Sequence, residues 1–152
     1  MRFKGDIIIT DPCYIIRDKD ELTEDDWQAC DYGENMEALG IKNYLCRNTI
    51  YGDWSCTTFR TENDEVLGEF CADAGLVAVF LLDEVLKYNP NFDYHTERPW
   101  TTTLIKDFDG DIELSVVPFT YIDEDTNEEC EDSEVRVVGT GNINFYTTQT
   151  GF

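Results

Sequence analysis

Three short segments of the chain each place an aspartate next to a residue type that favours a turn. They are Asp11-Pro12-Cys13-Tyr14, Tyr51-Gly52-Asp53-Trp54 and Ala72-Asp73-Ala74-Gly75. If the fold brings Asp11, Asp53 and Asp73 together, their carboxylates could bind a cation or divide the roles of general acid and general base. The candidate polar site consists of Asp11, Tyr14, Asp53 and Asp73.

The same aspartates also suit ordinary turns. An aspartate before proline or beside glycine accepts hydrogen bonds from nearby backbone amides. The sequence favours this structural interpretation over a shared site. We therefore expect no catalytic residue, no bound metal and no cofactor.

The order and spacing of the three segments resemble those of small uncharacterised proteins of bacteria and their phages. In those proteins a Gly/Thr-Asp-Pro-Cys-Tyr turn precedes Tyr-Gly-Asp and Asp-Ala/Ser-Gly elements. The resemblance extends to roughly Leu76, which is about half of the chain. It implies no established activity, but phages benefit from inhibitors of host defence nucleases, so it favours an inhibitor.

Other signatures of enzymes are weak. The single histidine, His95, lies in a polar segment, so a Ser-His-Asp or Cys-His arrangement has little support. The segment Gly139-Thr140-Gly141 lacks the Lys-Ser/Thr of a phosphate-binding loop. Alternating acids from Asp107 to Glu113 superficially resemble a calcium loop, but their glycine comes too early for an EF-hand. Enzyme activity is therefore left open but is not favoured.

Negative charge is the property that departs most from average. The chain has 33 acidic and 11 basic residues, a net charge of −22. Such a field repels nucleic acid and anionic membranes and attracts proteins with basic grooves. We therefore expect a basic protein partner, no direct nucleic-acid binding and no membrane binding, while the oligomeric state stays open.

Two acidic zones are the candidate contact surfaces, with 9 acids in residues 18–37 and 8 in residues 123–134. Tyrosines beside acids could anchor an interface, where tyrosine is enriched. The candidate anchors are Tyr32, Tyr51, Tyr94 and Tyr121. The candidate partner-binding residues are Asp25, Asp26, Asp123, Glu124, Asp125, Glu128, Glu129, Glu131 and Asp132.

Two functions follow from these features. The first is an acidic binding or inhibitory protein, in particular a phage-type nucleic-acid mimic that occupies the basic groove of a host nucleic-acid-binding defence effector. The alternative is a carboxylate-based, cation-dependent hydrolase or small-ligand binder that uses Asp11, Asp53 and Asp73.

The pattern of apolar and turn residues predicts a single domain, 1–152, of the β-rich α+β class. We expect an antiparallel sheet or a partly closed barrel with two or three short helices. Helices are predicted from Thr23 to Asp31, over 34–39 and over 82–88, and a hairpin turn at Asp109-Gly110. Strands are predicted over 5–10, 44–46, 54–60, 66–71, 76–80, 100–105, 111–117, 134–138 and 142–148, and a mobile loop over 123–134.

The cellular compartment is inferred from the absence of an apolar membrane-spanning run and of a signal-peptide pattern. No apolar run approaches the roughly 18 residues that a membrane-spanning helix needs. The first residues reach Asp6 and Asp11 too soon to form the uninterrupted apolar core of a signal peptide. We therefore expect a cytoplasmic protein in which all 6 cysteines are reduced.

Overall fold

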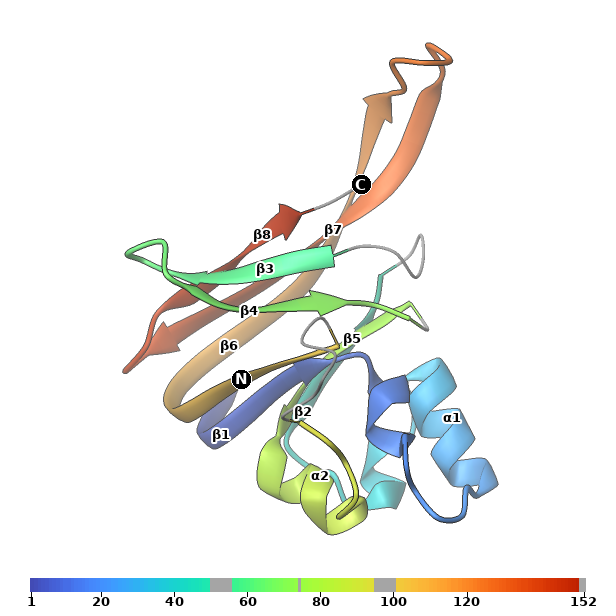
Figure 1. Cartoon of the computed structure of the whole chain (residues 1–152), viewed down its shortest axis with the longest axis vertical. Coiled ribbons are helices and arrows are strands. Elements are labelled where there is room, and N and C mark those ends of the chain that lie inside the picture. The colour runs from blue at the N-terminus through green and yellow to red at the C-terminus, as the bar shows by residue number, and fades with distance from the viewer. Residues whose placement is uncertain (50–55, 74, 95–100, 151–152) are drawn as a thin grey trace.

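The computed structural model describes residues 1–49, 56–73, 75–94 and 101–150. These residues form one antiparallel eight-stranded sheet in the order β2-β5-β1-β6-β7-β8-β3-β4 (Figure 1). The sheet is open, with β2 and β4 as its edges, so the β-rich α+β class is confirmed but a barrel is not. The strands are β1 (Arg2–Thr10), β2 (Tyr44–Asn48), β3 (Cys56–Thr61), β4 (Val66–Cys71), β5 (Leu76–Leu81), β6 (Thr102–Ile122), β7 (Glu129–Gly141) and β8 (Phe145–Thr150). The helices are α1 (Glu24–Tyr32) and α2 (Leu82–Tyr88), with 3-10 turns η1 (Pro12–Ile16) and η2 (Met36–Leu39).

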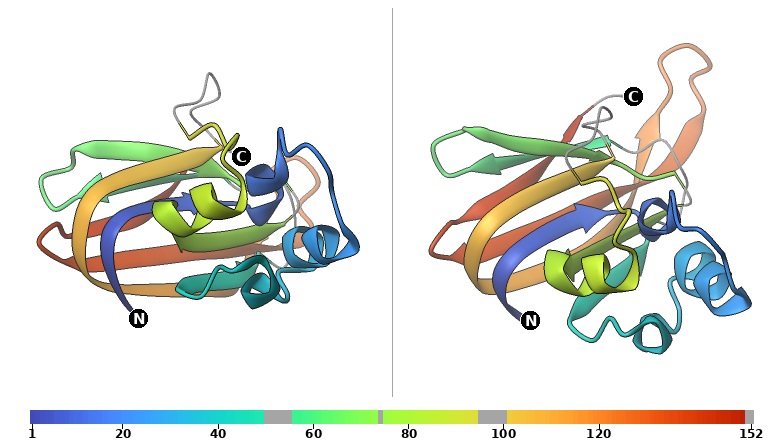
Figure 2. Two further views of the ribbon diagram at one scale, coloured as in Figure 1. Left: turned by 90° about the horizontal axis from the view of Figure 1, so that it is seen from below. Right: turned by 60° about the horizontal axis from the view of Figure 1, so that its bottom comes forward.

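The second half of β1, from Ile7 to Thr10, and nearly all of β5 are buried on both faces. Ile7 and Ile9 of β1 belong to one apolar cluster, whereas Ile8 belongs to a second cluster on the other face. This division follows from the alternation of side chains along a strand, which lets one apolar run fill two cores. The second cluster lies under the helices, which gather on one side of the sheet (Figure 2).

The first cluster lies inside the curl of the sheet. Strand β4 returns against β6, where the Thr103 hydroxyl donates a hydrogen bond to the carbonyl of Glu69 at 2.8 Å. Aromatic rings fill this space, and the Phe108 and Phe145 rings meet edge to face at 5.7 Å. The curl therefore buries both faces of the second half of β1 without closing the sheet.

Both predicted helices with clear start and stop signals form where expected. Thr23 caps α1 in a capping box with Asp26, and Gly33 ends the helix with a φ of 68°. Helix α2 spans Leu82–Tyr88 as predicted. The helix predicted over 34–39 is reduced to the 3-10 turn η2, which Gly40 ends.

The hairpin predicted at Asp109-Gly110 is wrong, because β6 runs through this segment as one strand of 21 residues. Asp107 has a φ of 53° and its amide donates to the Asp6 carboxylate, beside a register shift in β1. A bulge of this kind bends a strand without reversing it. Gly110 permits close pairing with β7, because a Cβ there would lie 2.3 Å from the Thr140 carbonyl oxygen.

The acidic segment 123–134 is not a loop throughout, since β7 begins at Glu129. Together β6 and β7 project beyond the other strands as a two-stranded ribbon (Figure 1). We call residues 117–134 the arm.

The cysteines do not share one redox state. Among the described residues, Cys13, Cys30, Cys46 and Cys130 are free thiols. Cys71 is disulfide-bonded, so the expectation that every cysteine is reduced is wrong for this residue. No helix in the described parts of the chain is long and apolar enough to cross a membrane.

Candidate functional site

Asp11 lies fully buried at the end of β1 and links two of the sequence segments singled out for chemistry. One carboxylate oxygen accepts a hydrogen bond from the Cys13 amide at 3.1 Å. The other accepts from the Asp73 amide at 3.0 Å and the Leu76 amide at 3.2 Å. Both carboxylate oxygens of Asp11 therefore bind backbone amides. Asp11 is also the N-cap of η1, directly before Pro12, a position that favours an aspartate.

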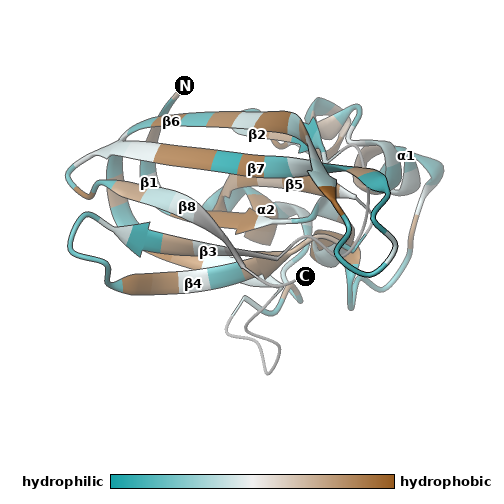
Figure 3. Cartoon of the chain, turned by 90° about the horizontal axis from the view of Figure 1, so that it is seen from above, coloured by the Kyte–Doolittle hydropathy of each residue, from teal (hydrophilic) through white to brown (hydrophobic). Residues whose placement is uncertain are grey.

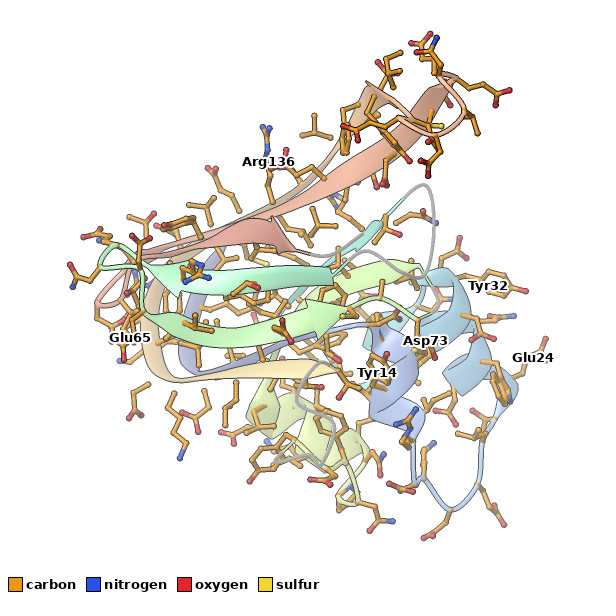
Figure 4. All side chains as sticks on the ribbon, turned by 45° about the horizontal axis from the view of Figure 1, so that its top comes forward. Tyr14, Glu24, Tyr32, Glu65, Asp73 and Arg136 are labelled. Atoms are coloured by element: carbon orange, nitrogen blue, oxygen red, sulfur yellow. The ribbon has the colours of Figure 1, made fainter. Side chains whose placement is uncertain are left out.

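Tyr14 and Asp73 lie near each other (Figure 4), but their side chains make different contacts. The Tyr14 hydroxyl donates to the Cys71 carbonyl at 3.3 Å. Burial, together with the nearby Cys13 and Asp73, raises the pKa of Tyr14 far above its ordinary value, so the phenol stays protonated. The Asp73 side chain is exposed, with one oxygen 4.0 Å from the Cys13 sulfur.

Thr49, which precedes the third segment in the sequence, lies at the same place. Its amide and hydroxyl both donate to the Gly75 carbonyl, at 2.8 and 3.0 Å. Asp53 itself lies outside the described residues. Within the described ranges no group of three or more His, Cys, Asp or Glu could hold a metal ion. We call this meeting point of Asp11, Thr49, Asp73, Gly75 and Leu76 the Asp11 junction.

The arm is the outer part of a β6–β7 ribbon that continues past the points where the neighbouring strands stop pairing. Strand β1 pairs with β6 as far as Asp111, and β8 pairs with β7 at Val138 and Gly139. Beyond these points β6 and β7 continue in unbroken register to Ile122 opposite Glu129. An isolated two-stranded ribbon is marginal in water, so the arm depends on the sheet at its base.

The two strands of the arm differ in chemistry. Its β6 side, residues 117–122, has no charged residue, and Phe119, Tyr121 and Ile122 are 36%, 45% and 58% exposed. The β7 side, residues 129–134, carries four acids, and the tip, residues 123–128, carries four more. Residues 117–134 contain no Lys, Arg or His. The tip is accordingly hydrophilic in Figure 3.

Asp123 forms the turn at the tip rather than facing a partner. Its carboxylate accepts from the Asp125 amide at 2.8 Å, and its own amide donates to the Glu128 carbonyl at 2.9 Å. The tip therefore contains a turn that is held by hydrogen bonds from its own backbone. Five other predicted partner-binding residues of the arm are exposed, Glu124, Asp125, Glu128, Glu129 and Glu131, whereas Asp132 is half-buried.

The root of the arm is tied to the Asp11 junction. Ser133 of β7 is fully buried, and its hydroxyl donates to the Thr49 carbonyl. Thr49 is in turn hydrogen-bonded to the Gly75 carbonyl. The next residue, Leu76, donates its amide hydrogen to the carboxylate of Asp11. The segments of Asp11 and Asp73, two of the three that looked like a polar site, thus support the base of the arm.

The acidic zone around α1 is only partly available to a partner. Asp26, a candidate partner-binding residue, is 1% exposed and accepts from Lys19 at 2.6 Å and from the Tyr88 hydroxyl at 2.6 Å. Burial alone would raise the pKa of Asp26, but hydrogen bonds from Lys19, Thr23 and Tyr88 outweigh it and lower the pKa to about 2. Its role is structural, whereas the adjacent Asp25 is exposed.

Exposed aromatic residues mark both acidic zones. The predicted anchors Tyr32 and Tyr121 are exposed, whereas Tyr94 stacks on Phe92 and Tyr51 lies outside the described residues. Sequence reasoning missed Phe119 and Trp27, which are 36% and 47% exposed. The pattern Phe119-x-Tyr121 beside an acidic run was the available signal for a strand face without a core beneath it.

Comparison with known proteins assigns no family. No protein-family model matches the chain, and neither the curated proteins nor the solved structures gave a match.

Proposed function

We propose that the chain is an acidic binding protein whose arm occupies the basic groove of a nucleic-acid-binding protein. The observation that carries the proposal is the arm itself, a projecting ribbon with eight acids and no basic residue. A projecting element can enter a groove that the body of the sheet cannot. The resemblance to phage proteins favours a host defence effector as the partner.

The spacing of charge on the arm is within about twofold of that along one strand of nucleic acid. Residues 129–134 span about 17 Å at about 3.3 Å per residue. Their four carboxylates therefore lie about 5.5 Å apart along the strand on average, against about 3.4 Å per charge along one strand of a DNA helix. A groove that binds phosphates can bind this row of carboxylates by the same charge complementarity.

The net charge of −22 would also raise the rate of association with a basic partner through electrostatic steering. A strongly negative molecule meets a positive groove faster, and salt weakens the effect. The alternative, a hydrolase or ligand binder built on Asp11, Asp53 and Asp73, gains no support from the described residues, because both oxygens of Asp11 bind backbone amides.

Competition for nucleic acid tests the proposal. A panel of purified basic nucleic-acid-binding proteins, each loaded with a fluorescent DNA or RNA, is titrated with the chain at low and high salt. We expect the chain to release nucleic acid from members of the panel, with the larger effect at low salt. Release from none of them at low salt would refute the proposal.

Two matched variants separate the arm from net charge. The arm variant replaces five exposed acids, Glu124, Asp125, Glu128, Glu129 and Glu131, with their amides. The helix variant makes the same change at five exposed acids around α1, Asp20, Glu21, Glu24, Asp25 and Asp31. Only the arm variant is expected to lose most of its ability to displace nucleic acid from the partner.

A further inference from the structure

We infer that the arm imitates a single nucleic-acid strand rather than a duplex, with its β7 acids in place of phosphates and Phe119 and Tyr121 in place of bases. The partner groove is then one that binds single-stranded DNA or RNA. This inference rests on the proposed function and names the class of groove.

The register of β6 and β7 sets one of the two aromatic rings directly beside a carboxylate. Phe119 lies opposite Asp132, and Tyr121 lies opposite Cys130. Residues directly opposite each other in a ladder point to the same face, and the two strands are about 4.8 Å apart. The ring centroids of Phe119 and Tyr121 are 6.2 Å apart. One face of the arm thus carries a short column of rings beside Asp132 and Glu134 of β7. The other two β7 acids, Glu129 and Glu131, lie on the opposite face.

Grooves for single strands need both of these features. They combine a positive channel that follows the backbone with aromatic or arginine side chains on which bases stack. A duplex instead presents phosphates on two strands and hides the faces of its bases. The arm has acids on β7 and at the tip but none on residues 117–122, so its charge is one-sided like that of a single strand.

The Tyr121 ring remains neutral, as a base would be. Cys130, directly opposite, and then the nearby acids raise the pKa of Tyr121. The phenol therefore keeps its proton at neutral pH and adds no charge to the column of rings.

Charge also excludes a second copy of this chain as the occupant. Exposed apolar groups that gather on one surface are typical of binding sites. Around Phe119 and Tyr121, however, the arm carries eight acids and no cation, so two arms would repel each other. A basic groove with stacking side chains satisfies both the rings and the carboxylates.

The test compares two kinds of probe. One is a panel of purified OB-fold single-strand-binding proteins loaded with fluorescent oligothymidine. The other is a panel of helix-turn-helix proteins loaded with fluorescent duplex DNA. Displacement is followed by anisotropy, with wild type, the double variant Phe119→Ala/Tyr121→Ala, and a matched control, Trp27→Ala/Tyr32→Ala, which removes two exposed aromatics from the α1 zone.

We expect wild type and the control to displace oligothymidine at similar concentrations. The arm double variant should require a concentration at least about 10-fold higher for the same displacement, because the loss of stacking aromatic rings weakens binding on this scale. Its thermal unfolding should match wild type, because neither ring belongs to a core cluster. Equal displacement by all three proteins would overturn the inference.

Failure of the inference is distinguishable from failure of the proposed function. If the chain displaces duplex DNA but not oligothymidine, the single-strand inference is wrong and the proposed function stands. If it displaces neither probe, both are wrong.

Discussion

Replacing Asp11 with asparagine preserves the shape of a buried side chain but turns one of its two acceptor oxygens into an NH₂ donor. In wild type one oxygen serves the Cys13 amide and the other serves the Asp73 and Leu76 amides. The better orientation of the asparagine keeps its oxygen on the latter two. The NH₂ group then faces the Cys13 amide, donor against donor.

The expected cost follows from those bonds. A hydrogen bond to a charged group contributes about 1.5–3 kcal/mol, and an unsatisfied buried donor costs about 1–3 kcal/mol. Relief from burying a charge offsets part of this loss. We expect Asp11→Asn to lower the free energy of unfolding by about 2–4 kcal/mol, a large share of the 5–15 kcal/mol typical of a domain.

Chemical denaturation monitored by circular dichroism measures the change, with Asp73→Asn as the matched control. Asp73 lies in the same junction and its backbone amide binds Asp11, but its side chain is exposed. The control should therefore stay within about 0.5 kcal/mol of wild type. Residues that serve a function at the expense of the fold give the opposite result, because replacing them stabilises the protein. If Asp11→Asn left stability unchanged or raised it, the structural role of Asp11 would be refuted.

Three further predictions concern pH, thiols and packing. Folding lowers the pKa of Asp26 from 3.8 to about 2, so the stabilisation by its carboxylate is present above pH 3.8 and is lost as the pH falls through about 2. Asp26→Asn should therefore lower the free energy of unfolding by about 2 kcal/mol at pH 7. This deficit should shrink below about pH 4, as measured by urea unfolding. Burial raises the pKa of Cys30 to about 12, so native-state alkylation followed by mass spectrometry should modify Cys130 well before Cys30. Gly139→Ala would place a Cβ 2.1 Å from the Phe145 ring and should cost about 1–3 kcal/mol in thermal unfolding.

Each of these predictions has a control and a contradicting result. Asp25→Asn, one position from Asp26 but exposed, should show no such pH-dependent deficit. Equal alkylation rates of Cys30 and Cys130 would show that Cys30 is accessible. Thr140→Ala, at an exposed site beside Gly139, should be nearly neutral, and a neutral Gly139→Ala would contradict the packing given for Phe145.

Elements with local signals could be predicted from the sequence. The Thr23 cap, the acids after it and Gly33 define α1 without reference to the rest of the chain. Helix α2 likewise follows from its own spacing and from Asn89-Pro90. These interactions are close in sequence, so the pattern contains the information that decides them.

Elements decided by distant partners could not be predicted. Asp109-Gly110 is a favourable hairpin turn by itself, but β1 and β7 pair with it and keep it extended. The link from Asp11 to the arm through Thr49 and Ser133 joins residues far apart in sequence and was equally invisible. For the acidic run, charge predicted its exposure, but only the β6–β7 register shows Phe119 beside Asp132.

The rate of association with a partner found by competition tests the central claim most directly. Stopped-flow mixing compares wild type, the arm variant and the helix variant at low and high salt, with equal charge removed from both variants. We predict that the association rate constant of the arm variant is lower than that of wild type by about 10-fold or more, and that it depends less steeply on salt. The rate constant of the helix variant should stay within about 3-fold of wild type. Equal rates and equal salt slopes for the two variants would show that net charge alone acts, and that the arm has no special part in binding.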